Sequence, residues 1–65
     1  MKKYYLYVKE PYEGKRYVRE DTGNCYHREH GAFFDSAAEA EAFAVGMYPR
    51  GSEKLWRLEL DIRSL

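Results

Sequence analysis

A change in periodicity along the chain limits the folds that it can adopt. Residues 3–10 and 54–63 alternate apolar and polar side chains, which is the pattern of a strand with one buried face. Residues 36–47 instead carry apolar side chains at helical spacing. One helix among strands, in a chain of 65 residues, predicts a single domain spanning residues 1–65. The expected fold class is α+β, a small antiparallel or mixed sheet with one helix packed on one face.

Turn-forming residues divide the N-terminal part of the chain into short segments. Proline and glycine within residues 11–14 and an Asp-Thr-Gly-Asn run at 21–24 predict two turns. The segments that the turns separate are expected to be strands, at residues 3–10, 15–20 and 25–28. With the helix and the last strand, the order becomes β-β-β-α-β. A right-handed crossover through the helix predicts that the last strand lies beside the first and parallel to it.

The start of the helix is the most strongly marked point in the sequence. Ser36 and Glu39 match a capping box, in which the serine hydroxyl accepts a backbone N–H and the glutamate reaches back to the cap. Asp35 adds negative charge at the end where the helix dipole favours it. Alanine-rich sequence follows, and Gly46 and Pro49 predict the end of the helix.

The apolar faces of these elements define an expected core. Every second residue is apolar on the first and last strands, and the apolar residues of the helix form one stripe. The expected core consists of Tyr4, Leu6, Val8, Val18, Phe33 or Phe34, Ala40, Phe43, Met47, Trp56, Leu58, Leu60 and Ile62.

A single helix leaves the second face of the sheet open in this prediction. If the first two strands form a hairpin, their outward side chains make an aromatic and basic surface, which the last strand extends. The candidate binding residues are Tyr5, Tyr7, Lys9, Lys15, Tyr17, Arg19 and Arg57. Tyrosine and arginine are frequent at protein interfaces, and rings beside cations also bind single-stranded nucleic acid. A third interpretation is that the tyrosines only stabilise an exposed sheet.

The charge balance favours a protein partner over nucleic acid. The chain has 11 Lys and Arg against 11 Asp and Glu, a formal net charge of zero, whereas dedicated nucleic-acid binders are normally basic. The helix segment carries Asp35, Glu39 and Glu41 but no Lys or Arg between residues 31 and 48. Glu39 and Glu41 therefore mark an acidic helix surface as a second candidate interface, although an ordinary solvated helix face explains them as well.

Patterns for catalysis and metal binding are weak. Cys25, His27 and His30 are zinc-ligand types within a short stretch, but their spacing matches no standard structural zinc pattern. A nucleophilic cysteine also needs an oxyanion hole, and no motif in the sequence supplies one. We therefore expect no enzyme activity, no cofactor and no metal site. The single cysteine and the absence of a long apolar run or a signal sequence predict a cytoplasmic protein without membrane contact.

Three segments of the chain carry a resemblance to a group of small proteins. These are residues 3–8, residues 14–18 and residues 33–43, the last with a Phe-x-Ser-x-x-Glu-Ala helix start. In this arrangement the chain resembles small phage- and prophage-encoded ββαβ proteins, some of which are anti-CRISPR inhibitors. The similarity spans most of the chain, but its motifs chiefly encode the fold.

The resemblance implies a non-catalytic binding protein of phage type, acting in the host cytoplasm. Its expected partner is a host nucleic-acid-handling complex, which it would inhibit by protein–protein contact. The zero net charge departs from the strongly acidic inhibitors that mimic DNA. The alternative is a small domain that binds single-stranded nucleic acid through the aromatic and basic sheet face. The protein is expected to be a monomer, or a homodimer built on a sheet edge or face.

Overall fold

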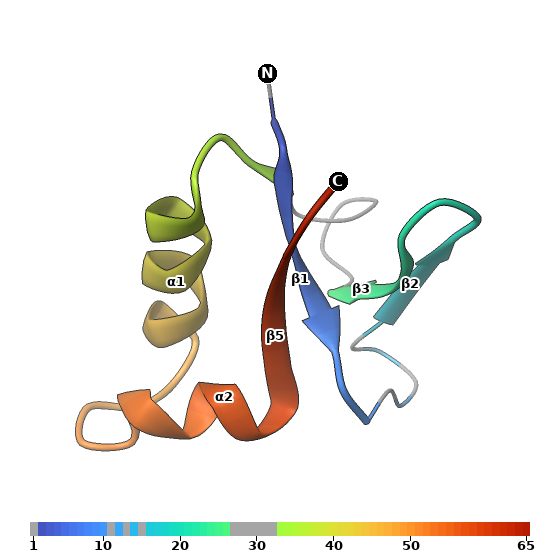
Figure 1. The fold of residues 1–65 in the computed structure, drawn as a ribbon. Coiled ribbons are helices and arrows are strands. Elements are labelled where there is room, and N and C mark those ends of the chain that lie inside the picture. Colours follow the sequence, from blue (N-terminus) through green and yellow to red (C-terminus); the bar gives the residue numbers. More distant parts are fainter. Residues whose placement is uncertain (1, 11, 13, 15, 27–32) are drawn as a thin grey trace.

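Strand β1 (Tyr4–Val8) lies at the centre of the sheet and pairs with three other strands. On one side it contacts β5 (Leu60–Ser64) over five residue pairs. It also pairs with β3 (Gly23–Tyr26) at Tyr7 and with the short β4 (Phe33–Phe34) at its first two residues. Strand β2 (Arg16–Arg19) pairs with β3. Every pairing is antiparallel, and Figure 1 shows the arrangement.

The structure is a computed structural model, and it describes residues 2–10, 12, 14, 16–26 and 33–65. The expected third strand is therefore seen in its first two residues, Cys25 and Tyr26, and its last two lie outside the described residues. In the part of the chain that is described, no helix is both long enough and apolar enough to cross a membrane.

The main helix, α1 (Ala37–Gly46), connects β4 to β5 and covers one face of the sheet (Figure 1). This confirms the predicted α+β class. The last strand lies beside β1 as predicted, but the prediction that it runs parallel to β1 was wrong. The crossover starts from β4, and β4 is itself antiparallel to β1. A strand that returns parallel to β4 on the other side of β1 must therefore run antiparallel to β1.

The capping box at the start of α1 is confirmed. Ser36 is the N-cap, and its hydroxyl accepts a hydrogen bond from the backbone N–H of Glu39 at 3.2 Å. The Glu39 carboxylate accepts the backbone N–H of Asp35 at 3.0 Å, one residue before the position expected for a standard box. The buried side of the helix is formed by Ala40 and Ala44, both fully buried, and such small side chains allow the helix to lie close to the sheet.

The core between α1 and the sheet has few large residues. Its buried members are Leu6, Val8, Ala40, Ala44, Trp56 and Leu60. Three partly buried aromatic rings pack against this core and against each other. The Phe43 ring centroid lies 5.3 Å from that of Phe34 and 6.1 Å from that of Tyr26. Met47, Ile62 and Phe43 are partly buried against this core, as the helical and strand patterns predicted.

Only the second part of the segment at residues 54–63, which was expected to be one long strand, forms a strand. A 3-10 turn, η1 (Glu53–Leu55), and a short helix, α2 (Trp56–Glu59), precede β5. Trp56 and Leu60 lie on one side under either interpretation, because a spacing of four fits both strand and helix periods. Leu58 distinguishes the strand from the helix, because a strand would direct its side chain into the core and a helical turn directs it away. It is 72% exposed, so its assignment to the core was wrong.

The prediction that Val18 points inward was also wrong, because Val18 is 58% exposed. In the β2–β3 hairpin, Tyr17 lies opposite Cys25, which is fully buried. Side chains alternate between the two faces of a strand, so burying the face that carries Tyr17 and Arg19 exposes the face that carries Val18.

The two leucines on either side of Glu59 provide a direct test of this local structure. Replacing Leu60 by Ala should lower the free energy of unfolding by about 2–5 kcal/mol, because a fully buried side chain leaves a cavity. Leu58→Ala should change it by less than about 0.5 kcal/mol, because the side chain is exposed. Urea denaturation of both variants measures the difference. Equal losses of unfolding free energy in the two variants would contradict the helical turn and support the continuous strand that periodicity alone predicts.

Candidate functional site

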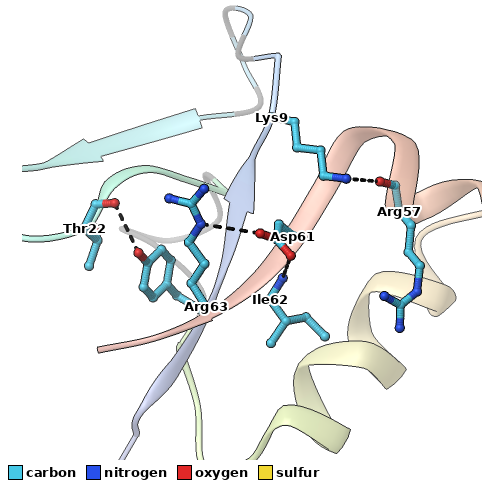
Figure 2. Close-up of polar contacts among 7 residues, drawn as sticks. Lys9, Thr22, Arg57, Asp61, Ile62 and Arg63 are labelled. Atoms are coloured by element: carbon cyan, nitrogen blue, oxygen red, sulfur yellow. Dashed lines mark hydrogen bonds and ion pairs between the residues drawn. The ribbon is translucent and has the colours of Figure 1, made fainter.

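The sheet face opposite α1 is partly covered by the β2–β3 hairpin. The Tyr5 hydroxyl on β1 donates a hydrogen bond to the backbone carbonyl of Thr22 at 3.3 Å (Figure 2). A Cβ placed on Gly23 would lie 3.7 Å from Cε2 of Tyr7, so the Tyr7 ring lies against this glycine. Gly23 has φ +77°, a conformation that favours glycine and that ends the hairpin turn. The turn of the hairpin therefore contacts both outward tyrosines of β1.

This contact changes the role of Tyr5. The residue was predicted to be an exposed binding ring, but it is only 6% exposed. Its neighbours include Thr22, which is also buried, and Phe33, whose ring centroid lies 6.1 Å away. Cys25, fully buried nearby in β3, donates its Sγ–H to the Tyr17 carbonyl at 3.2 Å. Tyr5 is thus part of a second, smaller buried cluster and is not available to a ligand.

Two arginines flank this cluster, and each one lies between a ring and a carboxylate. The Arg63 guanidinium lies 3.5 Å from the centroid of the Tyr7 ring, and its Nε is 3.5 Å from an Asp61 carboxylate oxygen (Figure 2). Asp61 is directly opposite Tyr7 in the β1–β5 pairing, which explains why the three side chains meet.

The second unit has the same composition. The Arg19 guanidinium lies 4.9 Å from the centroid of the Phe33 ring, and its Nη2 is 2.7 Å from the Asp21 carboxylate. We call the surface formed by both units the arginine–aromatic face. Its members are Tyr7, Arg19, Asp21, Phe33, Asp61 and Arg63.

The electrostatics of the arginine–aromatic face are balanced. Each guanidinium faces one carboxylate, so the two units add no net charge to the surface. The four charged side chains are between 36% and 54% exposed, and solvent keeps such ion pairs weak. The rings carry no charge, and their effect is to orient the arginine side chains. A guanidinium stacked on a ring has its flat side held, while its hydrogen-bonding edge stays available.

The remaining predicted basic residues lie elsewhere. The Lys9 ammonium donates to the Arg57 backbone carbonyl at 2.6 Å, at the end of the molecule formed by α2 (Figure 2). The Arg57 guanidinium packs over the Trp56 ring at 4.7 Å and pairs with Glu41 at 3.4 Å. Arg57 therefore lies against the helix layer and not on the arginine–aromatic face. Lys15 is outside the described residues.

The acidic helix surface is used largely within the protein. Glu39 caps the helix through the backbone N–H of Asp35, and Glu41 pairs with Arg57. Glu53, on η1, accepts the backbone N–H of Gly51 at 2.8 Å. Hydrogen bonds from the backbone N–H groups of Glu53 and Gly51 hold the pKa of Glu53 below its ordinary value. The structure thus brings no cluster of free carboxylates together among these residues.

Metal ligation is not supported by the described side chains. Among residues 2–10, 12, 14, 16–26 and 33–65, no group of three or more His, Cys, Asp or Glu residues could hold a metal ion. His27 and His30, two of the three residues considered as ligands, lie outside these ranges. Cys25 is buried and bonded to a backbone carbonyl.

Of the six members of the arginine–aromatic face, only Tyr7 and Arg19 were predicted as site residues. Asp21 was predicted only as part of a turn. Asp61 and Arg63 were assigned to the wet face of the last strand, but not to a site. Phe33 was considered only for the core. A usable signal was present, because the last strand was expected beside the first. That placement alone puts Asp61 and Arg63 next to the outward tyrosines of β1.

Comparisons of the chain with protein-family models, with curated proteins and with solved structures find no match. The function is therefore inferred from the chemistry of the arginine–aromatic face and from the sequence resemblance described above.

Because Tyr5 is buried, we expect its substitution to destabilise the protein and not to act by removing a binding contact. Tyr5→Ala should lower the free energy of unfolding by about 3–5 kcal/mol, because it removes a buried ring. Tyr12, 55% exposed, is the matched control, and Tyr12→Ala should cost less than about 1 kcal/mol. Thermal denaturation followed by circular dichroism distinguishes the two. If Tyr5→Ala melts like the wild type, the hairpin does not cover this ring in solution.

Proposed function

We propose that this is a non-catalytic binding protein that acts by protein–protein contact through the arginine–aromatic face. The observation that carries the proposal is the pair of units in which Arg19 and Arg63 each lie between a ring and a carboxylate. The resemblance to phage-encoded inhibitors supplies the target class, a host nucleic-acid-handling complex such as a CRISPR effector. Inhibition then occurs by steric blocking of the surface that the protein covers.

The composition and rigidity of the face support a protein partner. Arginine and tyrosine are among the residues that contribute most to protein interfaces. Stacking on the Tyr7 ring orients the Arg63 guanidinium before a partner arrives, which lowers the entropic cost of binding. The Arg63 side chain is still 46% exposed, so its remaining donors can reach a partner's carboxylates or carbonyls.

The same face is less suited to the alternative, single-stranded nucleic acid. A phosphate backbone requires unpaired cations, because binding depends on the release of counterions. Both arginines of the face already have a carboxylate beside them, at 2.7 Å for Asp21 and 3.5 Å for Asp61. These carboxylates would repel phosphates. The ring of Tyr5, which would have offered a stacking surface, is buried.

The proposal predicts inhibition that depends on Arg63. Purified protein is added to a panel of CRISPR effector complexes, and their binding to target DNA is measured. Wild-type protein should inhibit at least one complex, and Arg63→Ala should raise the concentration needed on the order of tenfold, as for a hot-spot residue. Arg50→Ala is the control, because Arg50 is an exposed arginine in the loop after α1. Thermal denaturation verifies that both variants fold.

Two outcomes would contradict the proposal in different ways. Inhibition by the wild type that is unchanged in Arg63→Ala would remove the arginine–aromatic face as the contact surface. No inhibition of any complex, together with salt-dependent binding of a single-stranded oligonucleotide that is lost in Tyr7→Ala, would establish the nucleic-acid alternative.

A further inference from the structure

The sheet has two outer strands, and they differ in how their edges are protected. In the described part of the chain, β2 pairs only with β3, and β5 pairs only with β1. The outer edge of such a strand presents backbone N–H and C=O groups that another strand can pair with. Proteins usually block these edges, so an edge without a block is a candidate interface.

Two outward N–H groups on the edge of β5 are bonded within the protein itself. The backbone N–H of Lys9 donates to Glu59, and that of Leu65 donates to Lys3, so the odd-numbered residues of β1 form the hydrogen-bonded pairs with β5. Ile62 lies between such pairs, and its backbone groups therefore point away from β1. The Asp61 carboxylate accepts the Ile62 N–H at 3.0 Å (Figure 2). The Leu60 N–H is bonded to the Trp56 carbonyl.

The edge strand β2 has exposed side chains in a pattern that favours pairing. Val18 is 58% exposed. Arg16, two residues earlier on the same face of β2, and Glu20, in the turn directly after the strand, are exposed as well. An open hollow of about 500 Å³ runs along the segment from Tyr17 to Asp21. An apolar residue between two opposite charges is the pattern of a strand that can pair with a copy of itself.

We propose that β2 pairs antiparallel with β2 of a second copy of this chain, with Val18 opposite Val18 at the twofold axis. In this register Arg16 lies opposite Glu20 of the second copy, and the symmetry forms this ion pair twice. On the other face Tyr17 lies opposite Arg19 of the second copy. Opposite charges directly across two strands are stabilising.

Only this register matches the charges. A shift by two residues in one direction places Arg19 opposite Arg19 and Val18 opposite Glu20. A shift in the other direction places Tyr17 opposite Tyr17 and Arg16 opposite Val18. A shift by one residue is excluded, because it brings side chains from opposite faces together. The chain's own β2 therefore complements this edge without any outside partner.

The dimer is expected to be weak. Two strands of four residues bury far less surface than the interface of a stable dimer, so association should depend strongly on concentration. The test is separate from that of the proposed function, because it measures association of the purified protein alone. The two surfaces share Arg19, but the unit formed by Arg63 and Asp61 lies on β5, the other outer strand.

Sedimentation velocity over a range of concentrations tests the interface. The wild type should convert from monomer to dimer as concentration rises, and Val18→Lys should remain a monomer, because two ammonium groups would meet at the axis. Leu58→Lys is the matched control, since it places the same charge on an even more exposed apolar residue of α2. A wild type that is monomeric throughout, or a dimer that is lost only in Leu58→Lys, overturns the proposal.

Charge reversal tests the register. Arg16→Glu and Glu20→Arg should each weaken the dimer on the order of tenfold, because each creates two like-charge pairs. The double variant should recover the wild-type affinity, since both ion pairs form again with exchanged charges. Within one chain the two residues are about 13 Å apart along an extended backbone and cannot pair with each other. Absence of recovery overturns the register.

A disulfide tests the axis. Val18→Cys should form a crosslinked dimer on mild oxidation, because residues directly opposite in an antiparallel pair lie within disulfide distance. The native Cys25 is fully buried and does not compete. Leu58→Cys is again the control and should crosslink slowly or not at all. Equal crosslinking of both variants would show random collision and would overturn the proposal.

Discussion

The structure depends on a first strand that is covered on both faces and paired on both edges. Leu6 and Val8 of β1 contact the helix layer, while Tyr5 contacts the turn of the β2–β3 hairpin. Three strands bond to the five residues of β1. In so small a chain, one element with four neighbours supplies most of the long-range order, because each neighbour would be marginal alone. The helix and the hairpin do not contact each other extensively and are positioned by β1.

The elements whose signals are local were predictable from the sequence. The N-cap at Ser36 needs only its own side chain and that of Glu39, and both bonds are present nearly as expected. The segment before β5 was not predictable from periodicity, because Trp56 and Leu60 satisfy the helix and strand periods equally. Helix propensity decides there, since Glu, Lys, Leu and Arg dominate residues 53–59. The predicted direction of the last strand was wrong for a different reason, because the sequence analysis did not identify the two-residue strand β4.

Only two of the six site residues, Tyr7 and Arg19, were predicted from the sequence, and the placement of the other four depends on tertiary structure. Alternation correctly placed Tyr5 and Tyr7 on the face away from the helix. It could not show that a distant turn lies over them, because the path of a hairpin depends on its twist and on Gly23. Tyr7 and Arg19 stay in the candidate site as predicted, Arg63 joins them, and Tyr5 leaves it. Tyr5 became structural, and the exposed chemistry moved to the guanidinium groups beside the rings.

The pairing of β1 with β5 has a consequence for how the chain is made. Leu6 meets Ile62, so the longest ladder of the sheet joins two segments near opposite ends of the chain. Such high contact order slows folding, because a long loop must close before the contacts form. During synthesis β1 leaves the ribosome before β5 and cannot pair with it until the hairpin and the helices between them have followed. An apolar, tyrosine-rich strand is then exposed for that interval, and we expect the nascent chain to be most prone to aggregation at this stage.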